Sequence, residues 1–295
     1  MMIAIVMGVV VLGASTSLAI GAMRSLAGTE LRDGIDRQAR FIGIGLQRDV
    51  QQTGIEIDAQ PTFGTIGAFA DTLVMLRVPF FGAPEMPAEG YARDSIPGGS
   101  GVGNCGALCV EVRRPVGEPF QINAGELAYL ELNASVRRLL RVTAVSLPTA
   151  TVARVTFANT TRILGHPAGI AGLNLSSSFK VRTIRATAFY RDAANQLIRA
   201  DSVTTAGAAV PQVVATGIQT WDASLVFVNG VEAAMADADT DADPDNDYDD
   251  IARVHLRATI QADRADSRVN NGVILSRVYD WWLAPRNLIY ERNRI

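Results

Sequence analysis

Hydrophobic positions in the first 54 residues follow two successive helical patterns. The stretch MMIAIVMGVVVLGASTSLAIGAM, residues 1–23, carries no charge before Arg24, and about 20 apolar residues suffice to cross a bilayer as a helix. A cleaved secretory signal is the alternative, but it would need a basic region before a shorter apolar core. We therefore expect residues 1–23 to form a membrane span.

The next segment, residues 24–54, continues as an amphipathic helix. Its apolar positions recur at intervals of three and four, which draws a single stripe along one helix face. The stripe consists of Leu31, Ile35, Ala39, Ile42, Leu46 and Val50. Gly54 is a typical C-terminal stop. One continuous helix is predicted, with its first half in lipid and its second half packed on a globular domain.

From Pro61 onward the hydrophobic period changes from 3.6 to 2, which is typical of β-strands. In residues 252–261, for example, alternate side chains are apolar, as in an antiparallel sheet with one buried face. Strands are expected at 71–78, 108–114, 127–133, 139–145, 151–157, 181–190, 223–229 and 252–261. The predicted fold class is α+β, a long N-terminal helix packed on an antiparallel sheet, with residues 55–295 forming the β-rich globular part. A division into two lobes near 165–175 stays open.

Composition adds a local concentration of acid to this picture. The chain has 295 residues and 48% hydrophobic content, ample for a buried core. Its net charge is −3, and removing the eight aspartates of residues 236–250 leaves +5. No dense basic run with interleaved aromatic residues accompanies this charge, so nucleic acid is not an expected partner.

The acidic loop 236–250, ADADTDADPDNDYDD, fits a calcium-binding pattern in one register. With Asp239 at position 1, carboxylates occupy the alternating positions that a wrapping loop points at a hard cation. The candidate ligands are Asp239, Asp241, Asp243, Asp245, Asp247 and Asp250. Against this pattern, Pro244 replaces the usual turn glycine, and the last position is aspartate instead of glutamate. Calcium binding and a solvated acidic loop remain alternatives.

Other candidate chemistry is sparse. Cys105 and Cys109 are too few for a closed zinc site and are compatible with a disulfide across a short loop. His166 and His255 have no serine or cysteine in a recognisable catalytic motif, and both are expected at the surface. Trp281 and Trp282 should point to opposite faces of a strand, one toward the core and one toward a subunit contact. No cofactor other than calcium, and no enzyme activity, is expected.

Both ends of the chain resemble a known family. The uncharged segment, with an amphipathic extension ending in IGLQRDVQQTGI, resembles the first helix of type IV pilin-like proteins. The extension is similar to those of minor pilins of the PilW type and of minor pseudopilins of type II secretion. Residues 217–288 also follow the order of the family: GIQTWDASLVFV, an Asp-rich loop, DDIARVHLRATIQAD, and SRVYDWWLAPRNL. The middle of the chain is not covered by the resemblance.

The family's processing signals are not assigned to any residue of this sequence. In the family a basic leader and a Gly-Phe-Thr-Leu-x-Glu cleavage motif precede the apolar segment, and this sequence begins where the residue after that glutamate would stand. Arg24, Arg32 and Arg37 follow the span, which by the positive-inside rule would keep the domain cytoplasmic. A basic leader would restore the opposite orientation, so we expect the true translation start to lie further upstream.

The resemblance implies a minor pilin-like structural component of a type IV pilus, in a priming or tip complex. Its helix would be anchored in the inner membrane, with the domain in the periplasm, and would then pack among other minor and major pilins at the cell surface. The helix-packing residues would be Val10, Leu12, Leu18, Leu31, Ile35, Ile42 and Leu46. The alternatives are a minor pseudopilin of type II secretion, and a single-span periplasmic enzyme or binding module.

Overall fold

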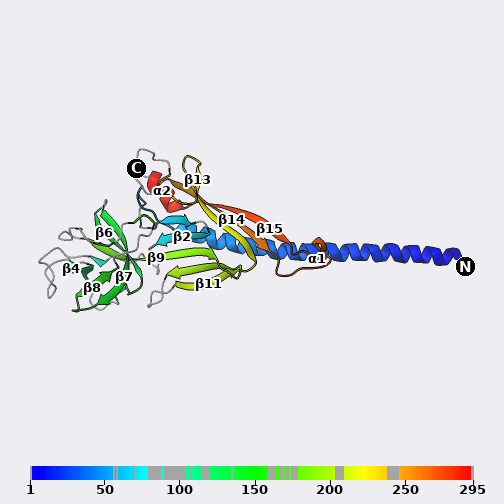
Figure 1. Cartoon of the computed structure of the whole chain (residues 1–295), viewed down its shortest axis with the longest axis horizontal. Coiled ribbons are helices and arrows are strands. Elements are labelled where there is room, and N and C mark those ends of the chain that lie inside the picture. Colours follow the sequence, from blue (N-terminus) through cyan, green and yellow to red (C-terminus); the bar gives the residue numbers. More distant parts are fainter. Residues whose placement is uncertain are drawn as a thin grey trace.

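The computed structural model describes most of the chain. The described residues are 2–55, 57, 59–69, 71–78, 88–89, 104–106, 108–113, 120–133, 136–158, 164–166, 169–170, 173, 179–202, 209–237 and 246–293. A long helix, α1, projects from a β-rich domain, and the N-terminus lies at its far end (Figure 1). The α+β class predicted from the sequence is confirmed.

Two helices, one 3-10 turn and fifteen strands form the described elements. The helical elements are α1 (Met2–Gln52), η1 (Asn270–Gly272) and α2 (Arg286–Asn293). The strands are β1 (Ile66–Phe69), β2 (Thr72–Arg77), β3 (Ala88–Glu89), β4 (Asn104–Gly106), β5 (Cys109–Arg113), β6 (Leu127–Asn133), β7 (Val136–Ser146), β8 (Val152–Phe157), β9 (Lys180–Arg191), β10 (Leu197–Ser202), β11 (Ala209–Ala215), β12 (Ile218–Phe227), β13 (Glu232–Ala233), β14 (Ile251–Gln261) and β15 (Ser276–Leu283).

All strand pairs are antiparallel and belong to two sheets. The larger sheet has 11 strands, with the path β1-β2-β9-β6-β7-β8-β5-β4; β3 and β10 also pair with β9, and β11 pairs with β10. The smaller sheet has four strands in the order β13-β12-β14-β15. Every strand predicted from the period-2 pattern is present, with ends shifted by a few residues at most places.

The 12-residue strand β9 joins two parts of the larger sheet. Its first half pairs with β6, where Ile184 lies opposite Leu127. Its second half pairs with β2 and β10, where Phe189 lies opposite both Leu73 and Arg199. The strand β9 therefore joins the part of the sheet around β6 to the part around β2 and β10.

Two hydrophobic cores lie on opposite faces of this sheet. On β6, Leu127 and Tyr129 belong to the first core, which also contains residues of α1. Ala128 and Leu130 of the same strand belong to a second core. The alternation follows from the pleat, since successive side chains of a strand point to opposite faces. The two cores thus share the strands β6, β7 and β9, and the part of the sheet around the second core is called here the distal lobe. A division of the chain near 165–175 stays a prediction, because several residues of that range lie outside the described part.

The smaller sheet covers α1 with its apolar face. On β14, Val254, Leu256, Ala258 and Ile260 are fully buried, and Arg253 and Arg257 on the other face are exposed. This is the one-sided burial that the sequence pattern predicts. In Figure 1, β14 and β15 lie along the half of α1 that is nearer the domain.

Candidate functional site: the helix α1 and the acidic loop

The half of α1 that lies in the domain buries the predicted stripe. Ile35, Ala39, Ile42, Leu46 and Val50 are all at most 3% exposed, and Leu31 is partly buried. Each fully buried Ile or Leu contributes roughly 1.5–3 kcal/mol to the free energy of unfolding. The helix ends at Gln52, and Gly54 follows with a φ of 76°, in agreement with the predicted stop.

A glycine allows β15 to approach this half of the helix closely. A Cβ added to Gly43 would lie 2.8 Å from Nε1 of Trp281, so any larger residue would displace the indole ring. Trp281 is packed against the first core, while its neighbour Trp282 is 52% exposed. The two tryptophans therefore point to opposite faces of β15, as the sequence predicts.

Two groups of polar contacts hold the same half of α1 on the domain, one at Asp36 and one at Asp49. Near its middle, Asp36 accepts a hydrogen bond from the hydroxyl of Tyr279 and another from Nη1 of Arg277 at 2.7 Å. The bond from Tyr279, together with Arg277, lowers the pKa of Asp36, and burial together with Asp36 raises the pKa of Tyr279 to about 12. At neutral pH the carboxyl group of Asp36 is therefore ionised and the hydroxyl of Tyr279 is protonated.

Close to the end of α1, Asp49 forms the deepest ion pair of the helix. It is 5% exposed, and Nε of Arg199 donates to its Oδ2 at 2.7 Å. Arg77 lies 3.7 Å from the other carboxylate oxygen, and Arg199 also pairs with Asp201. The network ties α1 to β2 and β10. From the sequence one could have inferred only that a charge beside Val50, on a buried stripe, needs a partner, and not that the partner is Arg199.

The opposite half of α1 is bare. Residues 11–26, called here the exposed stem, are all exposed, including Leu12 at 67% and Leu18 at 76%. In Figure 1 no strand accompanies this part of the helix. Of the predicted helix-packing residues, the structure buries Ile35, Ile42 and Leu46 and partly buries Leu31. Leu12 and Leu18 are exposed, with no packing partner among the described residues.

Within the part of the chain that the structure describes, no helix is both long enough and apolar enough to span a membrane. The predicted span at residues 1–23 lies partly outside that part, because Met1 and the side chains of residues 2–6 and 8–10, Val10 among them, are not described.

The acidic loop brings three aspartates together at its end. Asp247, Asp249 and Asp250 each offer a carboxylate oxygen, and these oxygens lie within 4.8 Å of one another. Two of them belong to the predicted register, and Asp249 is an addition to it. The remaining predicted ligands Asp239, Asp241, Asp243 and Asp245 lie outside the described residues. The cluster is therefore a candidate ion site at one end of the loop.

Tyr248 anchors this cluster to the domain. Its side chain is 6% exposed and belongs to the first core. It lies against Gly64, where an added Cβ would come within 2.3 Å of the ring. The backbone closes the loop through two further bonds, from the Asp237 amide to the Asn246 carbonyl at 2.9 Å and from the Asp250 amide to the Asp247 carbonyl at 3.2 Å. The three carboxylates are thus held on a fixed turn.

One histidine prediction is wrong. His166 is not at the surface but completely buried, between Phe63 and Tyr129, with Nε2 3.0 Å from the carbonyl oxygen of Gly64. Burial lowers the pKa of His166 to about 4. The aromatic side chains that cover the ring come from segments distant in the sequence, the loop at Phe63 and the strand β6.

The other histidine, His255, lies on the polar face of β14 as predicted. Its Nδ1 lies 2.7 Å from Glu232, its Nε2 lies 3.1 Å from Asp280, and its ring stacks on Trp282 at 3.9 Å. Glu232 also accepts a bond from the Ser224 hydroxyl, and these two bonds lower the pKa of Glu232. Because Ser224 bonds to the carboxylate and not to the imidazole, the group does not have the order of a hydrolase triad.

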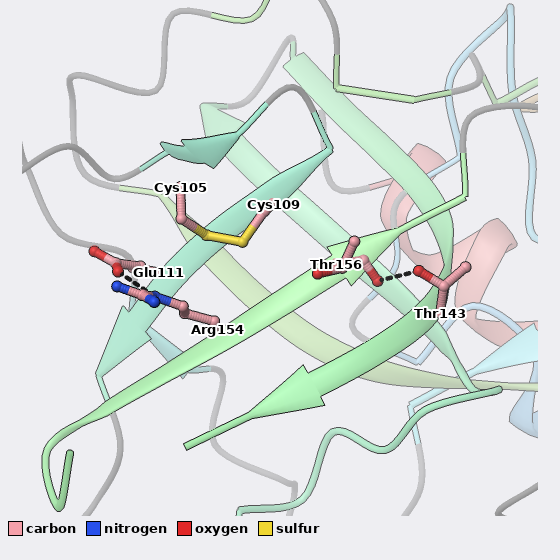
Figure 2. The surroundings of a disulfide bond; sticks show 6 residues. All are labelled: Cys105, Cys109, Glu111, Thr143, Arg154 and Thr156. Carbon is pink, nitrogen blue, oxygen red and sulfur yellow. Dashed lines mark hydrogen bonds and ion pairs between the residues drawn. A yellow bond between two sulfur atoms is a disulfide. The ribbon is translucent and has the colours of Figure 1, made fainter. Parts of the chain in front are cut away.

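The two cysteines form a disulfide in the distal lobe. Cys105 and Cys109 have Cα atoms 5.0 Å apart and join β4 to β5 (Figure 2). Beside them, the buried carboxylate of Glu111 accepts a 2.7 Å bond from Nε of Arg154 on β8. The hydroxyl of Thr143 on β7 donates to the carbonyl of Thr156 at 3.1 Å. These contacts fasten the strands β4, β5, β7 and β8 to one another.

Comparison with known proteins gives no match: no family model, no curated protein and no solved structure is significantly similar to the chain. The architecture itself is pilin-like, because a long N-terminal helix packs with one half against antiparallel β-sheets.

Proposed function

We propose that this chain is a minor pilin of the PilW type, a structural and assembly component of a type IV pilus. The observation that carries the proposal is the difference between the two halves of α1. One half buries most of an apolar stripe in its own domain, while the stem leaves large apolar side chains such as Val11, Leu12, Leu18 and Ile20 exposed. A helix that exposes this much apolar surface needs lipid or other apolar helices around it.

Both environments fit the two stages of pilus assembly. Before assembly the helix would be anchored in the inner membrane with the domain in the periplasm. It would then move into the fibre, where it would pack among the helices of other minor and major pilins without meeting water. The Cys105–Cys109 disulfide supports an oxidising compartment for the domain, such as the periplasm.

The substitution Leu12→Arg tests this proposal. An arginine in place of a leucine near the middle of a membrane helix costs about 3–4 kcal/mol of insertion free energy. We expect the variant protein to be lost from the membrane fraction of the native cells, as measured by carbonate extraction. We also expect these cells to lack pili, as seen by electron microscopy.

Phe41→Arg is the matched control. Phe41 lies on the same helix and is 64% exposed, close to the 67% of Leu12, but it belongs to the half that lies beside the domain. This variant should remain in the membrane. Normal fibres from cells with Leu12→Arg would count against the proposal, and a loss of protein secretion with intact fibres would assign the chain to a type II secretion system instead.

We also propose that the acidic loop binds calcium. The support is the meeting of Asp247, Asp249 and Asp250 on a turn held by Tyr248, because calcium prefers several carboxylate oxygens in one loop. Sites of extracellular modules have dissociation constants of about 10⁻⁴–10⁻³ M, so about 10 mM calcium would stabilise the folded chain by about 1–3 kcal/mol.

Calorimetry and thermal unfolding, with calcium and with chelator, test the site. Calcium should raise the melting temperature of the natural chain, and Asp250→Asn should reduce that increase. Asp237→Asn is the control, since Asp237 is exposed at the start of the loop and outside the cluster. The calcium site is disproved if calcium produces neither heat of binding nor a shift in melting.

A further inference from the structure

The connection between β14 and β15, residues 262–275, lies beside α1 at Gly28 and Glu30, just after residue 26, where the exposed stem ends. We call this connection the collar loop. Val269 lies 3.9 Å from the position of a Cβ on Gly28, and Nη2 of Arg264 lies 3.8 Å from Oε1 of Glu30. In Figure 1 it is the orange segment beside the blue helix, and it is the part of the domain nearest the N-terminus. Beyond it only the helix continues.

The position of the collar loop along the helix matches a bilayer surface. The uncharged segment ends at Met23, and Gly28 follows five residues later, which at about 1.5 Å per residue is about 7–8 Å along the axis. The polar layer on each side of a bilayer is about 5–7 Å thick outside a hydrocarbon core of about 30 Å. If the uncharged segment fills the core, the collar loop lies at the level of the lipid headgroups.

The collar loop combines exposed apolar side chains with paired charges. Val273 is 64% exposed and Ile274 is 37% exposed. Arg268 binds Asp266 through two bonds, from Nε at 2.9 Å and from Nη2 at 2.7 Å. Apolar side chains can enter the boundary between headgroups and acyl chains, and long arginine side chains can keep their charged ends in the polar layer.

We propose that the collar loop contacts the lipid headgroup layer, with Val273 and Ile274 inserted at its boundary with the acyl chains. The inference rests on the proposed function, because it needs the stem to be in a membrane. The contact would give the domain a second point of attachment and hold it against the membrane until the chain leaves for the fibre.

Fluorescent labels on single introduced cysteines test the contact in the full chain. Both natural cysteines are joined in the disulfide, so labels would attach only at Val273→Cys, Val228→Cys or Leu18→Cys. Val228 is the matched control because it is 55% exposed and follows the last residue of β12. The first residue of β12, Ile218, pairs with Ile260 next to the collar loop, and Val228 lies about 33 Å further along the strand. Each labelled chain is placed in phosphatidylcholine nanodiscs that carry a nitroxide quencher on the headgroup or deep on the acyl chain.

We expect the headgroup quencher to reduce the fluorescence at position 273 several-fold more than at position 228. The deep quencher should act on position 18. If position 18 is quenched but positions 273 and 228 behave alike, the collar contact is wrong and the membrane anchor stands. If position 18 is not quenched, the membrane anchor fails and the collar contact fails with it. A label at 273 that is shielded only after other pilin subunits are added would assign the surface to a neighbouring chain and overturn the lipid contact.

Discussion

At the scale of single residues, His166 shows how the domain fixes a protonation state. The ring is enclosed by Phe63 and Tyr129, and its Nδ1 has no hydrogen-bond partner in the described structure. The nearby guanidinium groups of Arg137 and Arg138 add to burial in lowering the pKa to about 4. At neutral pH the imidazole is therefore uncharged, with Nε2 donating to the Gly64 carbonyl.

Acid should destabilise the domain through this residue. In the unfolded chain the pKa returns to 6.5, so the folded state binds the proton more weakly. Above pH 6.5 the buried imidazole is uncharged in both states and costs no stability. As the pH falls toward 4, the unfolded chain binds the proton first, and the free energy of unfolding decreases. One tenfold difference in proton affinity equals about 1.4 kcal/mol, which puts the total loss at about 3 kcal/mol. Urea unfolding between pH 7 and pH 4 measures it.

His166→Phe isolates this contribution, because phenylalanine keeps an aromatic ring between Phe63 and Tyr129 but does not titrate. The variant loses the bond to Gly64 and should be less stable at pH 7. Its stability should then decline less than that of the natural chain as the pH falls. Parallel declines for the two proteins would show that His166 does not control the acid response.

At the scale of elements, α1 is one helix with two kinds of surroundings. Its domain half combines a buried stripe with the ion pair of Asp49 and Arg199, and the stem has neither. A buried carboxylate is tolerated only with a partner, so the pair fixes where α1 lies against β10 more specifically than apolar contacts could.

Asp49→Asn should weaken the attachment of α1. The amide cannot offset the charge of Arg199, and we expect a loss of about 2–3 kcal/mol in the free energy of unfolding. Asp33→Asn is the control on the same helix, where Asp33 is exposed, and it should change stability by less than about 0.5 kcal/mol. Denaturant titrations of both variants in one detergent provide the comparison, and equal stabilities would refute the role of Asp49.

The short elements escaped prediction for a physical reason. Strands β3 and β13 have two residues each, and β4 has three, so no alternation can be recognised in them. They exist because a neighbouring strand offers free backbone groups, as β9 does for β3. Longer strands such as β14 carry their own alternation and were predicted with nearly the right ends.

At the scale of the whole molecule, the chain separates its attachment from its outer end. The stem leaves the domain on one side, while β4 to β8 and the disulfide lie at the other (Figure 1). Between them β9 contributes residues to both cores as one continuous strand, and so connects the two parts of the domain. A fibre subunit built in this way would present the distal lobe outward.

The sequence by itself determined the long helix, its buried stripe, its stop at Gly54 and the alternation of the main strands, because each depends on a local period or on one residue's backbone preference. The spacing of Cys105 and Cys109 also allowed the disulfide that the structure shows, whereas the calcium register stays a prediction. Only the tertiary structure decided that His166 is buried, that Asp49 meets Arg199, that Trp281 lies on Gly43, and that Asp249 joins Asp247 and Asp250. Each of these depends on which distant segments are brought together or on how a turn closes, and no local pattern contains that information.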